Sequence, residues 1–391
     1  MRIVHVIPTL RLDRGGPVRA ALDLCQLLSD AGHDVTIWTN DPADAPPNWD
    51  GRHSEHPTVV DLGPLAVRNQ LLRPRQLRVI RELIEPAHAV HLHGMWELCN
   101  AQIATIARDI GVPYFVSPHG MLDTDCMNHR AWKKRLHMWF LGKAMLRGAH
   151  RIHLTARLEL EQSQAHFDPR KGVVIPFPID ARGFANLPGP AEALSRFPQI
   201  AAAAHRLMFL GRLHPIKGIE RLLRAAAALI AEGADLLVVL TGPGDESYIQ
   251  ELRKLIDELG IRDRVLMTGP ASGSLKLSLL QSSAAMVLPS YHENQGMVLL
   301  EALATGTPII TTNGVKIWQE LQASGAAKIT DGEPAQIAAT AREYFASEPA
   351  RVAAGAKGRE WVMKFVEPDE IRAKFHAMYA ADPIGTAPRA R

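Results

Sequence analysis

The sequence predicts an α/β protein made of two doubly wound, Rossmann-like domains that face each other across a cleft. Short, nearly continuous runs of aliphatic and β-branched residues recur along the chain, and longer helical patterns separate them. Such runs are typical of parallel strands buried on both faces, and their alternation with helices is typical of doubly wound sheets. The 391 residues also exceed what one hydrophobic core usually supports.

Six strands are expected in each half of the chain. They lie at residues 3–7, 35–38, 89–92, 114–116, 152–154 and 173–175, and then at 207–210, 236–240, 265–267, 286–288, 308–310 and 327–329. Helical patterns include residues 18–31, 219–232 and 248–259, with two last helices at about 334–345 and 367–380.

The division between the domains is expected near residues 178–179, within a stretch rich in proline, glycine and alanine. The prediction is a first domain over residues 1–178, a second over 179–366, and a C-terminal helix and tail over 367–391. Whether that helix crosses back to the first domain is left open, and the last ten residues are expected to fray. Ligands of such domains bind at the carboxyl ends of the strands, so the cleft is the expected site.

Composition excludes several classes of protein. A net charge of +3 is too small to indicate nucleic acid as the main partner. Three widely separated cysteines, Cys25, Cys99 and Cys126, predict neither a disulfide framework nor a zinc site. No apolar run reaches the roughly 18–20 residues of a membrane span, and the start MRIVHVIP is interpreted as a first strand. A cytoplasmic location is therefore expected.

The strongest motif is PSYHENQGMVLLEALATGTPII, residues 289–310. A strand ends at Pro289, and a helix begins near Gly296, so the helix N-terminus lies at the carboxyl edge of the sheet. Its free N–H groups form an anion site suited to a diphosphate. Glu293 and Glu301 bracket this site, and eight helical positions span about 12 Å. Glu301 also stands in an apolar run, where an unpaired carboxylate is costly.

A second motif supplies positive charge. In FLGRLHPIKGIERLLRAA, residues 209–226, a strand ends in Gly211, and Arg212 and Lys217 follow before a helix. Two cations beside a helix start suit a pyrophosphate.

These motifs resemble the large retaining glycosyltransferase family typified by sucrose synthases and bacterial mannosyltransferases, whose fold is called GT-B. The resemblance covers nearly the whole chain. It implies transfer of a hexose-type sugar from a UDP- or GDP-sugar to a glycan or lipid-linked saccharide, in bacterial polysaccharide or glycoconjugate synthesis, with no metal or other cofactor. The second domain would bind the donor, and the first would face the acceptor. The donor-binding residues implied are Gly15, Gly16, Arg212, Lys217, Gly242, Gly269, Leu275, Glu293, Asn294, Gln295, Gly296, Met297, Val298 and Glu301.

The resemblance also assigns roles in the reaction. Arg212 and Lys217 would stabilise the departing nucleotide, Glu293 would contact the sugar hydroxyls, and Glu301 would contact the ribose. His119, at the end of YFVSPHGMLD, would lie near the reacting sugar. In HLHGMWE, residues 91–97, the acceptor-binding candidates are His93, Trp96 and Glu97. Gln295 stands where the family commonly has an aromatic residue, which affects the shape of the sugar pocket.

Other interpretations are weaker. Asp123 and Asp125 spell the DxD metal signature of a different glycosyltransferase fold, but they lie far in sequence from the phosphate motifs. His91 and His93 share a strand face without a visible third ligand. A nucleotide-sugar 2-epimerase and a non-catalytic nucleotide-sugar- or glycan-binding subunit share the architecture, but the paired glutamates and cations argue against both. No GxGxxG follows the first strand, which disfavours a dehydrogenase.

The segment HRAWKKRLHMWFLGKAMLRGAHR, residues 129–151, is basic and aromatic. Two interpretations stay open: an amphipathic helix on the anionic inner face of the cytoplasmic membrane, or a helix packed on the sheet with solvated lysines.

Overall fold

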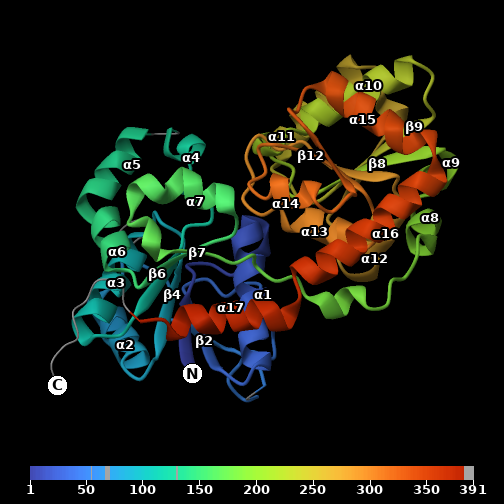
Figure 1. The fold of residues 1–391 in the computed structure, drawn as a ribbon. Helices are drawn as coiled ribbons and strands as arrows, with labels where there is room; N and C mark the ends of the chain where they lie inside the picture. The colour runs from blue at the N-terminus through green and yellow to red at the C-terminus, as the bar shows by residue number, and fades with distance from the viewer. Residues whose placement is uncertain (54, 67–70, 129–130, 383–391) are drawn as a thin grey trace. The chain divides into compact units, whose positions relative to one another are not determined.

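In the computed structural model the chain forms two compact units (Figure 1). The structure describes residues 1–53, 55–66, 71–128 and 131–382. Unit 1 is Met1–Pro178 together with the C-terminal helix α17 (Pro368–Ala380), and unit 2 is Ile179–Val366. The tail expected to fray lies, from residue 383 onward, outside the described residues.

Unit 1 contains a seven-stranded parallel sheet in the order β3-β2-β1-β4-β5-β6-β7. Its strands are β1 (Arg2–Val6), β2 (Asp34–Thr39), β3 (Thr58–Asp61), β4 (Ala89–His93), β5 (Tyr114–Ser117), β6 (Arg151–Leu154) and β7 (Gly172–Val174). The expected strands are all present. The edge strand β3 was not predicted, because its four partly exposed residues lack a continuous apolar run.

The helices of unit 1 cover this sheet. They are α1 (Gly16–Asp30), α2 (Pro74–Ile84), α3 (Leu98–Ile110), α4 (Thr124–Asn128), α5 (Ala131–His137), α6 (Lys143–Gly148), α7 (Arg157–Ser163) and α17. A π-helical turn at Met138–Gly142 joins α5 to α6. The amphipathic α1 buries Val18, Leu24 and Leu28, and α17 packs beside it (Figure 1).

Unit 2 contains a six-stranded parallel sheet in the order β10-β9-β8-β11-β12-β13. Its strands are β8 (His205–Leu210), β9 (Leu236–Thr241), β10 (Val265–Gly269), β11 (Ala285–Leu288), β12 (Ile309–Thr312) and β13 (Ala327–Thr330). Its helices are α8 (Ala191–Arg196), α9 (Pro198–Ala202), α10 (Ile219–Ala231), α11 (Glu246–Glu258), α12 (Gly273–Gln281), α13 (Met297–Ala304), α14 (Trp318–Gln322), α15 (Pro334–Ala346) and α16 (Glu348–Phe365). Two doubly wound parallel sheets confirm the predicted α/β class.

The long helix α16 was not predicted. It contains two glycines, which lower helix propensity and blur an apolar stripe. Both glycines have packing reasons. A Cβ on Gly355 would lie 2.0 Å from the Gly306 carbonyl oxygen, and one on Gly358 would lie 2.8 Å from Leu303. These close approaches seat α16 against α13.

Candidate functional site: a loop cluster in unit 2 and a histidine cluster in unit 1

Three glycines meet at the carboxyl edge of the sheet in unit 2. The Gly211 N–H donates to the Thr241 carbonyl over 3.0 Å, and the Gly242 N–H donates to the Gly269 carbonyl over 2.9 Å. A Cβ on Gly242 would come within 1.9 Å of the Gly211 carbonyl oxygen. Only glycine allows this approach, so the ends of β8, β9 and β10 lie close together.

The loop after β8 lies directly against the loop after β11. Gly218, the N-cap of α10, has a φ of 65°, and a Cβ there would lie 2.2 Å from the Pro289 carbonyl oxygen. The Tyr291 N–H donates to the Ile216 carbonyl over 2.9 Å. The structure therefore brings Lys217 beside the loop that carries Glu293, as a diphosphate site between these motifs requires.

Lys217 and Glu293 form an ion pair, and both side chains are 18% exposed. The Glu293 N–H donates to the Gly314 carbonyl over 3.0 Å, and the Lys316 N–H donates to the Glu293 carbonyl over 3.0 Å. These bonds fix the backbone beneath the carboxylate. Arg212 is exposed on the same loop as Lys217.

The helix α13 begins as the sequence predicted. Gly296 is its N-cap, with a φ of 66°, and Met297 and Val298 form its half-buried first turn. The first N–H groups of a helix lack partners within that helix, so this end favours an anion. Before it, Gln295 is buried, and the Asn294 Oδ1 atom is buried without a hydrogen-bond partner in the described part of the chain.

Glu301 has a partner that sequence reasoning missed. The Lys276 Nζ lies 2.9 Å from its Oε1 atom, and the two side chains are 21% and 13% exposed, respectively. The premise that Glu301 stands unpaired in an apolar run is therefore wrong. The available signal was one lysine in the otherwise uncharged helix α12, whose first turn also places Leu275, half-buried, beyond Gly269.

A second missed element is a clamp on the β11–α13 loop. The Arg221 guanidinium stacks 3.6 Å from the centroid of the Tyr291 ring and donates to the Pro289 carbonyl over 3.3 Å. The Tyr291 hydroxyl in turn donates to Glu220 over 2.7 Å. A cation stacked on an aromatic face adds stabilisation, so α10 holds the loop that presents Glu293.

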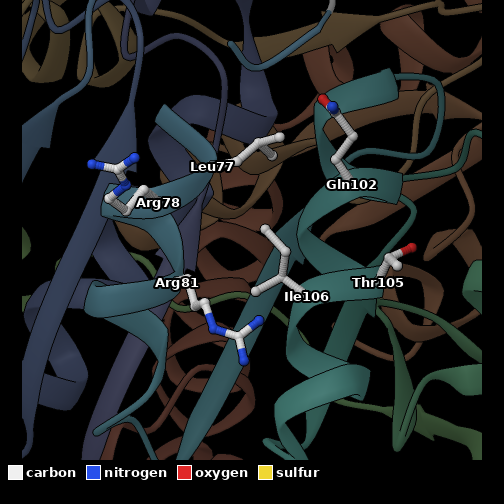
Figure 2. Close-up of a pocket in the computed structure, with 6 residues that line it drawn as sticks. All are labelled: Leu77, Arg78, Arg81, Gln102, Thr105 and Ile106. Atoms are coloured by element: carbon white, nitrogen blue, oxygen red, sulfur yellow. The ribbon is translucent and has the colours of Figure 1, made fainter. Parts of the chain in front are cut away.

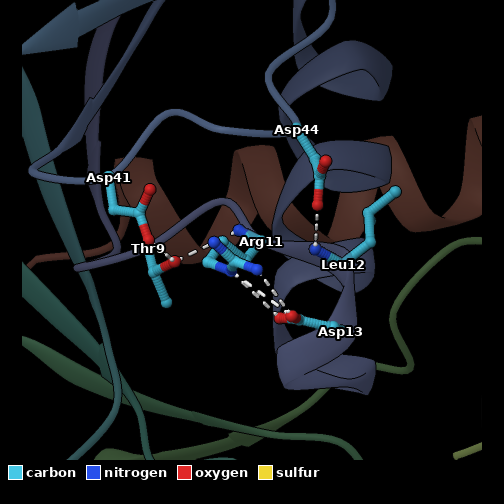
Figure 3. Close-up of polar contacts among 6 residues, drawn as sticks. All are labelled: Thr9, Arg11, Leu12, Asp13, Asp41 and Asp44. Atoms are coloured by element: carbon cyan, nitrogen blue, oxygen red, sulfur yellow. Dashed lines mark hydrogen bonds and ion pairs between the residues drawn. The ribbon is translucent and has the colours of Figure 1, made fainter. Parts of the chain in front are cut away.

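In unit 1, the loop between β1 and α1 has the conformation expected of a glycine pair. Gly15 has a φ of 101° and is the N-cap of α1, and Gly16 is the first residue of that helix. The Leu12 N–H donates to the Asp44 carboxylate over 2.8 Å, which ties the loop down (Figure 3). Further contacts in Figure 3 join Arg11 to Asp13, the Arg11 N–H to Thr9, and Thr9 to Asp41.

Three histidines form a hydrogen-bonded row at the carboxyl edge of this sheet. His5 Nδ1 lies 3.0 Å from His93 Nε2, and His93 Nδ1 lies 3.0 Å from His119 Nε2. His93 is 2% exposed and both of its ring nitrogens are engaged. It lies next to His119 in the row, and its role at the acceptor stays a prediction. His119 is half-buried and stacks on Phe177, with ring centroids 5.2 Å apart.

A second row of hydrogen bonds joins α17 to the sheet. The Ile175 carbonyl, at one end of this row, determines which atoms carry the protons. The Ile175 carbonyl can only accept, so His153 Nε2 donates to it over 2.8 Å. His153 Nδ1 then accepts from the Ser117 hydroxyl, which accepts from His91 Nε2, each over 2.7 Å. His91 Nδ1 is left to accept from the Tyr379 hydroxyl over 2.7 Å. Every ring nitrogen in this row is satisfied.

Burial keeps these histidines neutral. It lowers the pKa of His5 and His119 to about 3, with a smaller contribution from the His153 ring, and it lowers that of His153 to about 4 against the opposing hydrogen bond to the Ile175 carbonyl. The pKa values of His91 and His93 are also well below their usual range, chiefly through burial. His119 is therefore a neutral hydrogen-bonding group near pH 7.

His5 supplies the third nitrogen donor that the sequence did not reveal beside His91 and His93. The hydrogen bonds described above use both ring nitrogens of His91 and of His93. A shared metal ion would have to displace them, so this geometry favours hydrogen-bonded rows. Of the DxD pair, Asp123 is buried, and the side chain of Asp125 lies outside the described part of the chain.

The other acceptor candidates lie near the start of α3. Glu97 is the N-cap of α3, and burial raises its pKa. The Trp96 ring meets His137 edge-on, and the Lys134 ammonium lies 5.4 Å from a Trp96 ring centroid. Trp96 and Glu97 are each half-buried.

The basic, aromatic segment exposes its large apolar side chains. Trp132, Trp139 and Phe140 are 67%, 69% and 61% exposed, and Leu136 and Leu141 are exposed as well. The interpretation as a helix that buries this face on the sheet is wrong for these five residues. Residues 129 and 130 lie outside the described part.

Among the described residues, no helix combines the length and apolar character that crossing a membrane demands.

A cavity of about 480 Å³ lies between α2 and α3 (Figure 2). Leu77 and Ile106 supply apolar surface, and Arg78 and Arg81 stand at its side. None of its lining side chains belongs to either candidate centre.

Comparison with known proteins identifies both halves. Residues 15–178 match the model of the glycosyl transferase 4-like domain, and residues 192–361 match that of the glycosyl transferases group 1. A D-inositol 3-phosphate glycosyltransferase of Thermobispora bispora is 28% identical over 371 residues, covering 88% of this chain and 85% of the relative. The relative of the same name from Rhodococcus opacus is 35% identical over 151 residues, which cover 37% of this chain and 34% of the relative.

Solved structures share the fold. The Anabaena protein Alr3699/HepE, in complex with UDP and glucose, superposes with a TM-score of 0.78 at 15% identity, covering 96% of this chain and 98% of the other. Sucrose-phosphate synthase from Thermosynechococcus elongatus superposes with a TM-score of 0.76 at 18% identity, covering 97% and 98%. With two Rossmann-like units and both family domains in order, the chain belongs to the GT-B glycosyltransferases.

Proposed function

We propose that the chain transfers a hexose-type sugar from a nucleoside-diphosphate donor, UDP- or GDP-linked, to a saccharide or lipid-linked acceptor, with retention of anomeric configuration. The observation that carries this proposal is the ion pair of Lys217 with Glu293, three residues before the N-cap of α13. A cation, a carboxylate and a free helix N-terminus at one sheet edge match a sugar diphosphate, which offers hydroxyls on one side and negative charge on the other.

The proposed reaction uses this arrangement as follows. The bond between the anomeric carbon and the diphosphate oxygen breaks, and a bond to the acceptor oxygen forms on the same face of the sugar. The acceptor proton passes to the departing phosphate. Lys217, Arg212 and the first N–H groups of α13 offset the charge that develops there, and we propose that no metal ion is needed. Glu293 binds sugar hydroxyls once the phosphate engages Lys217.

The HepE structures support the choice of donor, and the sequence relatives support the choice of acceptor. The HepE structures contain UDP, UDP with glucose, and UDP-glucose, which makes UDP-glucose the first donor to try. The relatives named D-inositol 3-phosphate glycosyltransferase act on a phosphorylated polyol, so D-inositol 3-phosphate belongs in any acceptor panel beside lipid-linked saccharides of bacterial glycoconjugates. A nucleotide-sugar 2-epimerase would release a rearranged sugar without an acceptor, and product analysis separates the two activities.

Donor binding is expected to stabilise the protein against heat. UDP-, GDP- and ADP-sugars are screened by thermal shift, and a true donor at 100 times its Kd adds about 2.7 kcal/mol to the free energy of unfolding. The Glu301→Ala variant is expected to lose most of this gain, because the ribose loses its carboxylate. Glu343→Ala, which removes the exposed partner of Lys328 in the same unit, is the control and should keep the gain. No shift with any nucleotide sugar would contradict the proposal.

We also propose peripheral attachment to an anionic membrane through residues 131–148. Trp132, Trp139 and Phe140 are the exposed apolar groups, and exposed Lys133 and Arg135 accompany them. No aspartate or glutamate occurs between residues 126 and 158. Exposed apolar groups in a segment whose charged side chains are all basic suit an acidic phospholipid surface, where each basic residue adds about 1 kcal/mol.

Vesicle binding checks this attachment. We expect co-sedimentation with vesicles containing phosphatidylglycerol but not with pure phosphatidylcholine, and a loss of at least about tenfold in affinity for Trp139→Ser with Phe140→Ser. Val352→Ser, which removes an apolar side chain 60% exposed on α16, is the matched control and should bind like the wild type. Equal binding to both kinds of vesicle, or dimerisation that the double substitution abolishes, would overturn the lipid assignment.

A further inference from the structure

Among the non-glycine residues that the structure describes, His119 is the one with a positive φ. Its φ of 53° lies in the left-handed region, which side chains with a Cβ rarely adopt. Such strain persists only where surrounding contacts hold it, and it concentrates at functional positions. We therefore identify the residues whose contacts stabilise this turn.

A buried carboxylate holds the backbone of the turn. Glu159, at the start of α7, is 1% exposed, and its Oε1 atom accepts the Gly120 N–H over 2.7 Å. Its Oε2 atom accepts the N–H and the hydroxyl of Thr155 over 2.7 and 2.9 Å. One carboxylate thus joins the turn after β5 to the turn after β6, and the bond to Gly120 fixes the residue that follows His119.

A second contact holds the ring. His93 Nδ1 lies 3.0 Å from His119 Nε2, and His5 stands behind His93 in the same row. Phe177 stacks on the His119 ring, with 9° between the planes. An imidazole offers only two ring nitrogens, so engagement of Nε2 leaves Nδ1 as the one atom that an incoming group can meet. In the described part of the chain, Nδ1 has no partner.

We infer that Glu159 and His93 are positioning residues, which hold His119 in its left-handed conformation and leave Nδ1 as its single ligand-facing atom. The group that meets Nδ1 is an oxygen of a sugar hydroxyl or phosphate. The expected effect on catalysis rests on the proposed transfer reaction, whereas the contacts that Glu159 and His93 make do not depend on it. Because each hydrogen bond in the row holds one proton, His93 and His119 have the same tautomer. The buried His5 Nε2 has no partner in the described part of the chain, so a proton there is disfavoured and the row places the protons of all three rings on Nδ1.

Nitrogen-15 NMR of the histidine rings tests the geometry without a substrate. In the full-length wild type, His119 is expected to show one tautomer rather than a rapidly exchanging mixture. His93→Phe removes the hydrogen bond but keeps a ring in place, so His119 should change to a mixture while far-UV circular dichroism stays unchanged. His150→Phe is the control and should leave the His119 signals as they are, because the His150 N–H bonds the Tyr114 carbonyl at the start of β5, whereas His119 follows the end of that strand. A tautomer mixture in the wild type, or unchanged His119 signals in His93→Phe, would overturn the inference.

Steady-state kinetics test whether the positioning of His119 affects the transfer reaction. His93→Phe and Glu159→Gln are expected to lower kcat by about 10- to 100-fold with little change in KM for the donor, since a displaced group costs rate more than binding. If Glu159→Gln does not fold, His93→Phe still decides the matter. Unchanged kcat together with altered His119 signals would reject a role in the reaction. A wild type with one tautomer and no transferase activity would count against the proposed function alone.

Discussion

Lys217→Met is expected to reduce the transfer rate by about 100- to 1,000-fold. The substitution keeps most of the apolar stem and removes the charge that we propose faces the leaving diphosphate. Loss of one preorganised donor at developing negative charge typically has an effect of this size. It also leaves Glu293 without its ion-pair partner, so that carboxylate would repel the phosphate. The measurement is kcat with the donor found by thermal shift, at saturating acceptor.

The matched control is Lys328→Met. Lys328 also pairs with a glutamate in unit 2, with its Nζ 2.8 Å from Glu343, but on the exposed side of β13. Surface pairs of this kind contribute little, and the transfer rate should stay within about twofold of the wild type. A Lys217→Met enzyme as fast as this control would remove Lys217 from the reaction, whatever its effect on stability.

Acidification is expected to destabilise unit 1 strongly. His5, His91, His93 and His153 are at most 2% exposed, and burial holds their folded pKa values well below the unfolded value of about 6.5. Below pH 6.5 the unfolded chain therefore binds protons that the folded chain refuses, so stability falls as the pH falls. From pH 6.5 to 5.5 the four rings together remove roughly 4 kcal/mol from the free energy of unfolding.

Denaturant unfolding between pH 7.5 and 5.5, with hydrogen exchange to separate the units, measures this effect. His5→Phe removes one of the titrating rings, so its stability should depend less on pH, by up to about 1.4 kcal/mol per pH unit. Replacement of His53, whose ring is 55% exposed, by glutamine should leave the dependence unchanged. Equal acid sensitivity in the two units would show that the histidine rows are not its cause.

The predicted site in unit 2 largely followed from local rules. A strand that ends in glycine, a loop with cations and a helix that starts at Gly296 are patterns within about twenty residues, and parallel strands place their carboxyl ends at one edge. The pairing of β8 with β11 then brings Lys217 to Glu293. Lys276 was missed because it reaches Glu301 from another helix, and no spacing within either helix reveals that contact.

The histidine cluster shows which features the sequence decides and which features only the tertiary structure decides. Alternation along β4 was enough to place His91 and His93 on one face, and the run of apolar strands was enough to determine the α/β class. His5, Ser117 and Tyr379 join these rings, and Glu159 meets the Gly120 N–H, only because distant strands pair and α17 packs beside α1. Hydrogen bonds form between whichever groups packing brings within about 3 Å, and sequence separation carries no information about that. The chain alone therefore determined its class and the spacing of the motifs that we propose bind phosphate, whereas the tertiary structure decided which buried groups share protons.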